Sequence, residues 1–491
     1  MSGKSRPNHR PIGGAAVAAL VVAFGSGCIS SDPTSDRLRV DELAADRLRT
    51  GFDAEDVARD PVLQPTAWNF ADPLDAETAV RVAFQRDPEI RLALARLDLA
   101  RAELAQADLP PNPAIDLAVG VAIDGISGAP AVAGITQQLT WIWTRDARVD
   151  DRDAARRAKI LEAAESMIAL DAEVRRLHAA AVAAHAMQVL DATHAEATRR
   201  TVETVTSIVE VGEASRVDLD RALVDAAESA TAAEAARSDA RRARLELLAA
   251  MGCPDGEASF EVVGILSSTG PVPGEARIVE LASVVRLDVA AARMGVVQAE
   301  AGRRLADAAR WPEIGAGAAW RRGFMDREAV VPGARITLPI LDDGSTGVAA
   351  ARARLDAARM HLLEVRREAI GSARATREAF VRSMRRSADY AEQVLEPAME
   401  AERLAESAYR EGVIDLTVLL LAQRRRVEVE RRLVQFRLTM QVERITLQEE
   451  VGGSFEIAPI PPAVPTVEAE STTALGEDRP PTEHPSTEVP S

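Results

Sequence analysis

Few residues in this chain have the types and spacing that catalysis or metal binding needs. His178 and His185 stand seven apart on one predicted helix, which separates them by ~10 Å along its axis. We therefore expect both imidazoles to be solvated or lumen-facing rather than to share a metal ion. Cys28 and Cys253 lie in regions of very different composition, and no CxxC or Cys/His cluster is present. The sequence predicts no metal site, no cofactor and no enzyme activity.

Cys28 is the cysteine whose surroundings predict a modification. Three basic residues are followed by an uncharged, mostly apolar stretch at 12–24 and by Gly25-Ser26-Gly27 directly before Cys28, the layout of a secretory signal. This ending resembles a bacterial lipoprotein box, in which the cysteine is lipidated, by palmitate for example, although Gly25 stands where the box usually has Leu. The alternative is a plain signal peptide with an incidental cysteine. Ile29 is not an acidic retention residue, so the resemblance implies the outer membrane.

The elements that must position any functional residue form a duplicated unit. Gly212 has its counterpart in Gly412, and Gly252 has its counterpart in Gly452. Each half reads as a helix, two strand-like runs, a very long helix and a second helix. A repeat of this size indicates one architecture built twice rather than two unrelated domains.

The long helices are predicted from the absence of breakers and from heptad spacing. Residues 145–211 contain no Gly or Pro and would span ~100 Å as a helix. Ile160, Met167 and Val174 are seven apart, a narrow coiled-coil seam. We expect a tight turn at 212–215 into a second helix that ends at Met251. The second half repeats this with a helix to Glu411, kinked at Pro397, and a last helix to Val451.

Four shorter runs alternate apolar with small or polar residues and predict strands at about 113–124, 131–143, 313–324 and 331–341. Such lengths approach the ~9–11 residues with which a tilted strand crosses an outer membrane. Four strands cannot close a barrel, whereas three copies would supply twelve. Four tryptophans lie in or beside these runs and are candidates for a membrane girdle, the alternative being the core of a small soluble sheet: Trp141, Trp143, Trp311 and Trp320.

Composition and breakers set the remaining boundaries. The net charge of −17 makes nucleic acid an unsuitable partner, because binding phosphates requires a basic face. We expect helical segments at 74–109 and 277–310, each stopped by a proline. The predicted order is a signal peptide at 1–27, a tether at 28–73, a first repeat at 74–255, a linker at 256–275, a second repeat at 276–452 and a Pro/Glu/Ser/Thr-rich disordered tail at 453–491.

Several short motifs resemble those of the TolC-type outer membrane factors, and the signal resembles that of their lipoprotein branch. They are Asp87-Pro88-Glu89-Ile90, Leu109-Pro110, the run from Ala334 to Gly344, and Ala408-Tyr409-Arg410-Glu411-Gly412-Val413-Ile414-Asp415-Leu416 with Leu420-Leu421-Ala422-Gln423 after it. The resemblance implies a mainly α fold with a small membrane β part. It also implies a homotrimer, with a shared 12-stranded β-barrel among outer membrane lipids and a trimeric α-barrel across the periplasm.

The same resemblance places the two interhelical turns at the periplasmic tip. Gly212, Ser215 and Gly412 would then contact a periplasmic adaptor protein, and Arg216, Asp218 and Asp415 would line the aperture, because a ring of like charges sets selectivity in a narrow pore. The alternative is that both aspartates only favour the helix dipole in a first turn. Many members carry aspartate before the Ala-Gln pair, where this chain has Leu421.

Two functions from different classes follow. The first is a passive outer membrane channel of a tripartite efflux pump or type I secretion system, driven by an inner-membrane transporter and located in the cell outer membrane with a lipid anchor. The second is a lipid-anchored periplasmic coiled-coil scaffold or adaptor without a pore. The paired strands, at equal points of a duplicated unit, favour the channel.

Overall fold

The computed structural model describes residues 29–48, 68–120, 129–266, 272–323 and 327–455. All of these residues belong to one compact unit, which ends at Ile457. The unit is mainly α-helical with one four-stranded sheet, as the sequence predicts. Within the described part of the chain, no helix has a stretch long and apolar enough to cross a membrane.

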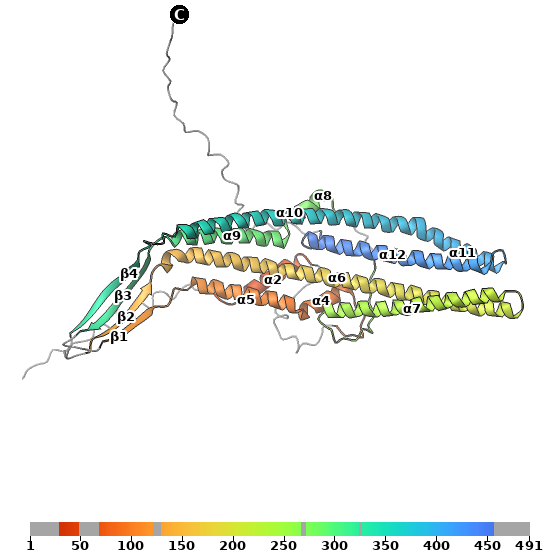
Figure 1. Cartoon of the computed structure of the whole chain (residues 1–491), viewed down its shortest axis with the longest axis horizontal. Helices are drawn as coiled ribbons and strands as arrows, with labels where there is room; N and C mark the ends of the chain where they lie inside the picture. The colour runs from red at the N-terminus through yellow and green to blue at the C-terminus, as the bar shows by residue number, and fades with distance from the viewer. Residues whose placement is uncertain (1–28, 49–67, 121–128, 267–271, 324–326, 456–491) are drawn as a thin grey trace, which may run out of the picture. The chain divides into compact units, whose positions relative to one another are not determined.

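The sheet is an antiparallel meander in sequence order. Its strands are β1 (Ala114–Val119), β2 (Ala131–Gln138), β3 (Glu313–Arg322) and β4 (Glu328–Thr337). Four helices connect directly to the strands: α5 (Pro88–Asp108), α6 (Trp141–Glu210), α9 (Leu287–Ala308) and α10 (Ser345–Tyr390). They pack in the same order, α5 on α6, α6 on α9 and α9 on α10 (Figure 1). The outer members of this row are therefore α5 with β1 and α10 with β4.

Two strands end earlier than the sequence predicts. β2 stops at Gln138, and Trp141 and Trp143 belong to the first turn of α6 rather than to a strand. The side chain of Thr140 ends the sheet by accepting the Ile314 N–H at 3.0 Å, and the Thr144 N–H then donates to the Thr140 carbonyl at 3.3 Å. β4 covers 328–337 instead of 331–341, because its partner β3 begins at Glu313, opposite Thr337.

The helices before each strand pair are broken where single helices were expected. α4 (Ala76–Arg86) ends at Asp87, whose carboxylate accepts the N–H groups of Glu89 and Ile90 and so begins α5. Pro88 at the first helical position lacks the N–H that would have continued α4. The second half has the equivalent break between α8 (Glu275–Val284) and α9.

The long helices pair as antiparallel hairpins. α6 turns at Gly212 into α7 (Arg216–Ala250), and α11 (Glu396–Arg410) turns at Gly412 into α12 (Leu416–Glu450). A π-helical turn, η2 (Ala391–Leu395), joins α10 to α11 immediately before Pro397. Proline cannot donate to a carbonyl four residues earlier, and a widened turn accommodates that loss.

The segment predicted as a tether is partly folded. α2 (Thr34–Ala45) packs on α6, and the side chains of Val40 and Leu43 are buried. Trp68 is also buried, against Phe70 and Phe260. Phe260 belongs to the predicted linker, which forms a bridge between Val262 and Leu74. The predicted signal peptide, Cys28 and most of the tail lie outside the described residues.

Candidate functional site

The four-stranded sheet has one mainly apolar face and one more polar face. The pairing register places Ile115 beside Ile135, Ala133 beside Trp320, and Trp320 beside Val330. Cross-strand partners share a face, so these residues form one continuous apolar surface. In the single chain this surface is open: Leu117 is 75% exposed and Val330 is 71% exposed. An exposed apolar sheet face indicates an apolar environment that one chain does not supply.

The opposite face carries polar and small residues. The same register places Asp116 beside Gly134 and Gly315 beside Arg335, and the face includes Thr136, Glu313, Arg321 and Thr337 by strand alternation. Among the described residues, the outer strands β1 and β4 each pair along one edge only. The arrangement suits a closed wall with apolar residues outside and polar residues facing a lumen.

The tryptophans lie at two levels along this sheet. Trp143 and Trp311 line one pocket with Ala308, Pro312 and Ile314, where α6 and α9 meet β3. Trp141 lies in the same first turn of α6, whereas Trp320 is near the far end of β3. The nine residues from Trp311 to Trp320 correspond to ~30 Å of extended chain. Aromatic residues therefore mark both ends of the strand region.

Two glycines form the turns at the far end of α6 and α11. Gly212 has φ +83° and Gly412 has φ +72°, a left-handed conformation that residues with a Cβ adopt only at a cost. After each glycine, an equivalent backbone hydrogen bond ends the preceding helix. The N–H of Glu213 donates to the carbonyl of Ile208 at 3.1 Å, and the N–H of Val413 donates to that of Ala408 at 2.9 Å.

Matching polar residues begin the two returning helices. The Ser215 hydroxyl accepts the Asp218 N–H at 3.2 Å and donates to the Asp218 carboxylate at 2.7 Å. In the second turn the Asp415 carboxylate accepts the Val418 N–H at 3.1 Å. Arg216 is exposed and pairs with Asp220 at 3.4 Å. The structure thus places the predicted aperture residues at the two turns, and both aspartates serve there as helix caps.

A small core holds the two turns together. Val205, Leu219, Ala405, Leu416 and Leu420 are buried in one cluster with Tyr409 against it. Arg221 donates from Nη1 to the Thr417 hydroxyl at 3.0 Å, across the turns, and pairs with Asp218 at 3.9 Å. Burial, with the nearby Asp218 carboxylate, raises the pKa of the Tyr409 hydroxyl. Arg221 and Thr417 were not identified from the sequence, since only the fold brings the two turns together.

Buried ion pairs join the hairpins above this core. Arg431 of α12 donates from Nε to the buried Asp191 of α6 at 2.7 Å, and Arg424 of α12 pairs with the buried Asp225 of α7. His194 lies among these charges, and its burial lowers the pKa of the imidazole. The three helices α6, α7 and α12 are therefore fixed in register by ionic contacts as well as by apolar ones.

Comparison with known proteins agrees with this geometry. Residues 278–453, which span α8 to α12, match the sequence model of the outer membrane efflux protein. This part of the chain resembles that family. No match was found among curated protein sequences.

Solved structures share the fold over most of the chain. VceC of Vibrio cholerae is 19% identical with a TM-score of 0.65, over 78% of this chain and 97% of that one. CusC is 15% identical with a TM-score of 0.66, over 80% and 96%. The outer-membrane channel OprN is 18% identical with a TM-score of 0.64, over 77% and 90%. The chain therefore shares the fold of these solved structures, the first half included.

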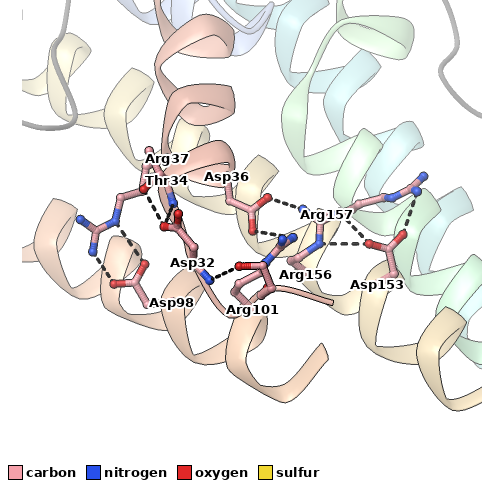
Figure 2. A network of polar contacts seen from close by, with 10 residues as sticks. Asp32, Thr34, Asp36, Arg37, Asp98, Arg101, Asp153, Arg156 and Arg157 are labelled. Carbon is pink, nitrogen blue, oxygen red and sulfur yellow. Dashed lines mark hydrogen bonds and ion pairs between the residues drawn. The ribbon is translucent and has the colours of Figure 1, made fainter. Parts of the chain in front are cut away.

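Charged contacts hold the segment before β1, from residue 29 to α2, against α5 and α6. Figure 2 shows Asp36 of α2 with Arg156 of α6, and Arg37 with Asp98 of α5. Arg101 of α5 donates from Nε to the Ser30 carbonyl at 2.7 Å. The N–H of Ile29 donates to the buried Asp108 carboxylate at 3.0 Å. Asp108 ends α5, six residues before β1, so residue 29 lies at the end of the helices nearest the sheet.

His178 corrects the expectation that both helix histidines are solvated or lumen-facing. Its ring is buried, and Nε2 lies 3.1 Å from the Leu74 carbonyl. Burial lowers the pKa of this imidazole below its ordinary value. The partner lies 104 positions away in sequence, so helical spacing alone could not reveal the contact. Among the described residues no group of His, Cys, Asp and Glu has the arrangement of a metal site.

Proposed function

We propose that this chain is the outer membrane channel of a tripartite efflux pump or type I secretion system. It acts as a passive trimeric duct through which an inner-membrane transporter exports its substrates. The observation that carries the proposal is the two-faced sheet with two free edges. Three copies would join β4 of one to β1 of the next, giving twelve strands with the apolar face toward lipid. A membrane would cover the apolar face, and the pairing between copies would leave no strand edge open to lipid.

The tryptophan levels support the same placement. A strand tilted by 35–45° would reduce the ~30 Å between Trp311 and Trp320 to roughly 23 Å along the membrane normal. That matches the ~25 Å height of an apolar band between aromatic girdles. The scaffold alternative gives no reason for an exposed apolar sheet at this height, and no catalytic role is assigned.

Adjacent residues on opposite faces of β1 give the test. Leu117→Arg places a charge on the apolar face, at an expected cost of about 2–4 kcal/mol per chain if that face meets lipid. Asp116→Arg is the matched control, because its side chain lies on the polar face. We expect Leu117→Arg to reduce the trimer recovered from outer membranes severalfold and Asp116→Arg to leave it nearly unchanged. Equal recovery of both variants would reject the membrane assignment.

We propose further that the two turns form the periplasmic aperture and the contact for an adaptor protein. Val211 and Val413, beside Gly212 and Gly412, are both more than 70% exposed, and exposed apolar residues at a tip suit a protein contact. Arg216, Asp218 and Asp415 would supply the charges that control ion passage.

Asparagine substitution separates the charge of these aspartates from their capping role. Asn accepts the same backbone hydrogen bond as Asp at a helix N-cap, so Asp415→Asn should keep the turn while removing its charge. We expect the variant to change cation preference in single-channel recordings, with unfolding temperature unaffected. Unchanged selectivity in Asp218→Asn and Asp415→Asn would remove both residues from the aperture and leave the duct intact.

The N-terminal contacts support a lipid anchor at Cys28. The N–H of Ile29 donates to Asp108, close to the start of β1. We place this end of the structure, the one with the sheet, in the membrane. A lipid on the preceding residue would reach the bilayer without a long tether. Mass spectrometry of the mature N-terminal peptide should find Cys28 acylated, and a Cys28→Ser variant should lack that mass. An unmodified Cys28 would leave the plain signal-peptide interpretation.

A further inference from the structure

An apolar cavity lies where the two middle helices of the row, α6 and α9, meet the sheet. It has a volume of about 470 Å³ and is lined by Trp143, Ala308, Trp311, Pro312 and Ile314; we call it the indole cavity. Its volume is that of a ligand site. Both indoles remain accessible in the single chain, Trp143 to 38% and Trp311 to 70%. The chain therefore builds an apolar site and leaves its two largest walls open.

The indole cavity continues the mainly apolar face of the sheet. Ile314 and Trp320 are an even number of positions apart on β3, so their side chains lie on the same face. Ile336 of β4 stands opposite Ile314 and is 54% exposed. A hydrocarbon chain that lies along this face therefore meets the cavity at Ile314, at the end of the sheet where the helices begin.

A neighbouring copy of the chain does not fill the indole cavity. Within one chain α6 packs between α5 and α9, and α9 packs between α6 and α10. Copies joined through β1 and β4 meet along the outer helices of the row, not along its middle. The cavity therefore stays open to the surroundings of the apolar face, which the proposed function makes the membrane.

An exposed cation stands beside this cavity, on the side away from the sheet. Arg310 directly precedes Trp311, and its Nε donates to the Asp343 carbonyl at 3.4 Å. The Asp343 carboxylate accepts the N–H of Ser345 at 3.0 Å. A Cβ added to Gly344 would lie 2.9 Å from Cγ of Arg310, so this loop packs against the arginine stem. The guanidinium keeps donors for an anionic group such as a phosphate.

We propose that the indole cavity binds one phospholipid per chain, with an acyl chain against the two indoles and the phosphate at Arg310. The inference deepens the proposed function and rests on it. Because the helices leave the sheet toward the periplasm in that function, the lipid belongs to the periplasmic leaflet. Indole rings suit this boundary between acyl chains and head groups. A lipid anchor on Cys28 is the poorer occupant, since its thioether-linked acyl groups bring no phosphate to Arg310.

Filling the cavity tests the acyl-chain contact. The delipidated, detergent-extracted protein is titrated with palmitoyl-oleoyl phosphatidylglycerol, and native mass spectrometry counts the bound lipids. We expect binding to saturate at one lipid per chain. Ala308→Phe places a ring in the cavity and should lower this occupancy severalfold. Ala309→Phe is the matched control, because Ala309 is exposed and does not line the cavity. Equal occupancy in the two variants, or binding that does not saturate, would overturn the proposal.

The head-group contact gives a test that leaves the cavity intact, should Ala308→Phe fail to assemble. Arg310→Gln should weaken phosphatidylglycerol binding about tenfold. Diacylglycerol with the same acyl chains lacks the phosphate, so its weaker binding should not change in Arg310→Gln. Arg304→Gln is the control, since that exposed arginine of α9 pairs with Asp150 at 2.7 Å. Equal losses for both lipids in Arg310→Gln would contradict a phosphate contact.

The outcomes separate this site from the proposed function and from the anchor. A trimer that conducts ions but binds no phospholipid to saturation would overturn the site while keeping the duct. A monomer without conductance would remove the duct itself. A Cys28→Ser variant should bind phosphatidylglycerol as the wild type does. Additional binding at the cavity in that variant only, with none in the wild type, would show that the anchor occupies it and would overturn the proposal.

Discussion

At the residue scale, the tip turns depend on a backbone conformation that few residue types adopt. Gly212 and Gly412 have left-handed φ values, and nothing lies within 4 Å of a Cβ added at either position. The two glycines therefore share this φ because the backbone of each turn requires it, and not because neighbouring atoms exclude a side chain. The caps that follow use different residues, Ser215 and Asp415, for the same bond to the helix start. The sequence predicted both turns because glycine and a capping residue act locally.

Replacing Gly412 measures this backbone cost. Gly412→Ala should destabilise the protein by about 1–2 kcal/mol, the cost of a Cβ in the left-handed region. Gly371→Ala is the control, since Gly371 lies within α10 and also has open space at its Cβ. Removing a helix-interior glycine should stabilise by about 0.5–1 kcal/mol. Denaturant unfolding of both variants measures the difference, and shifts of the same sign would contradict the account.

Glu165 of α6 gives a pH dependence with a defined sign. Burial, with the nearby Asp288 carboxylate, raises the pKa of Glu165 to about 7. The folded state then holds a proton that the unfolded state releases above its ordinary pKa of 4.5. Stability from this group is present at low pH and is lost as the pH rises from about 4.5 to 7. With ~1.4 kcal/mol per pKa unit and allowance for partial exposure, the loss is about 1–3 kcal/mol.

The Glu165→Gln variant should remove that loss and be more stable than the wild type at pH 8. Glu173→Gln, an exposed carboxylate on the same helix, is the control and should leave the pH dependence as it was. Thermal unfolding between pH 5 and 8 provides the measurement. A Glu165→Gln variant that loses stability in parallel with the wild type would contradict the assignment.

At the element scale, the sequence predicted what local patterns determine and missed what distant contacts determine. The long helices were predicted from the absence of Gly and Pro and from heptad spacing. The strand pairs were predicted from the alternation of apolar with small or polar residues. The end of β2 was not predicted, because Thr140 stops the sheet through a bond to Ile314 in the other half. α2 was missed because its buried side includes Asp36, which is fixed by Arg156 and Arg101 and gives no apolar periodicity.

Asp36 therefore decides whether α2 stays docked on α6. Asp36→Ala should cost about 2–3 kcal/mol, because Arg156 keeps Asp153 but loses its other carboxylate in a partly buried site. Hydrogen exchange should then rise selectively in residues 34–45. Asp32→Ala, whose carboxylate accepts only from Thr34 at an exposed site, is the control and should change exchange little. Equal protection of α2 in both variants would show that apolar contacts alone hold it.

At the scale of the whole molecule, the single chain leaves part of its apolar surface and of its strand edges uncovered. The sheet exposes a mainly apolar face, and its outer strands pair along one edge only among the described residues. The first half follows the second in its elements, although the family match covers only 278–453. The sequence predicted this duplication, since glycines and strand pairs recur at one offset. The sequence did not predict which helices lie at the edges of the row, because that depends on how distant segments of the chain pack.

The most direct test of the central claim is the conductance of the detergent-extracted protein in planar bilayers, with its oligomer mass measured on the same sample. The account predicts a trimer with small, cation-selective single-channel currents, as acidic groups at a narrow aperture require. A monomer or dimer that gives no current would contradict the duct and leave the periplasmic scaffold as the better description.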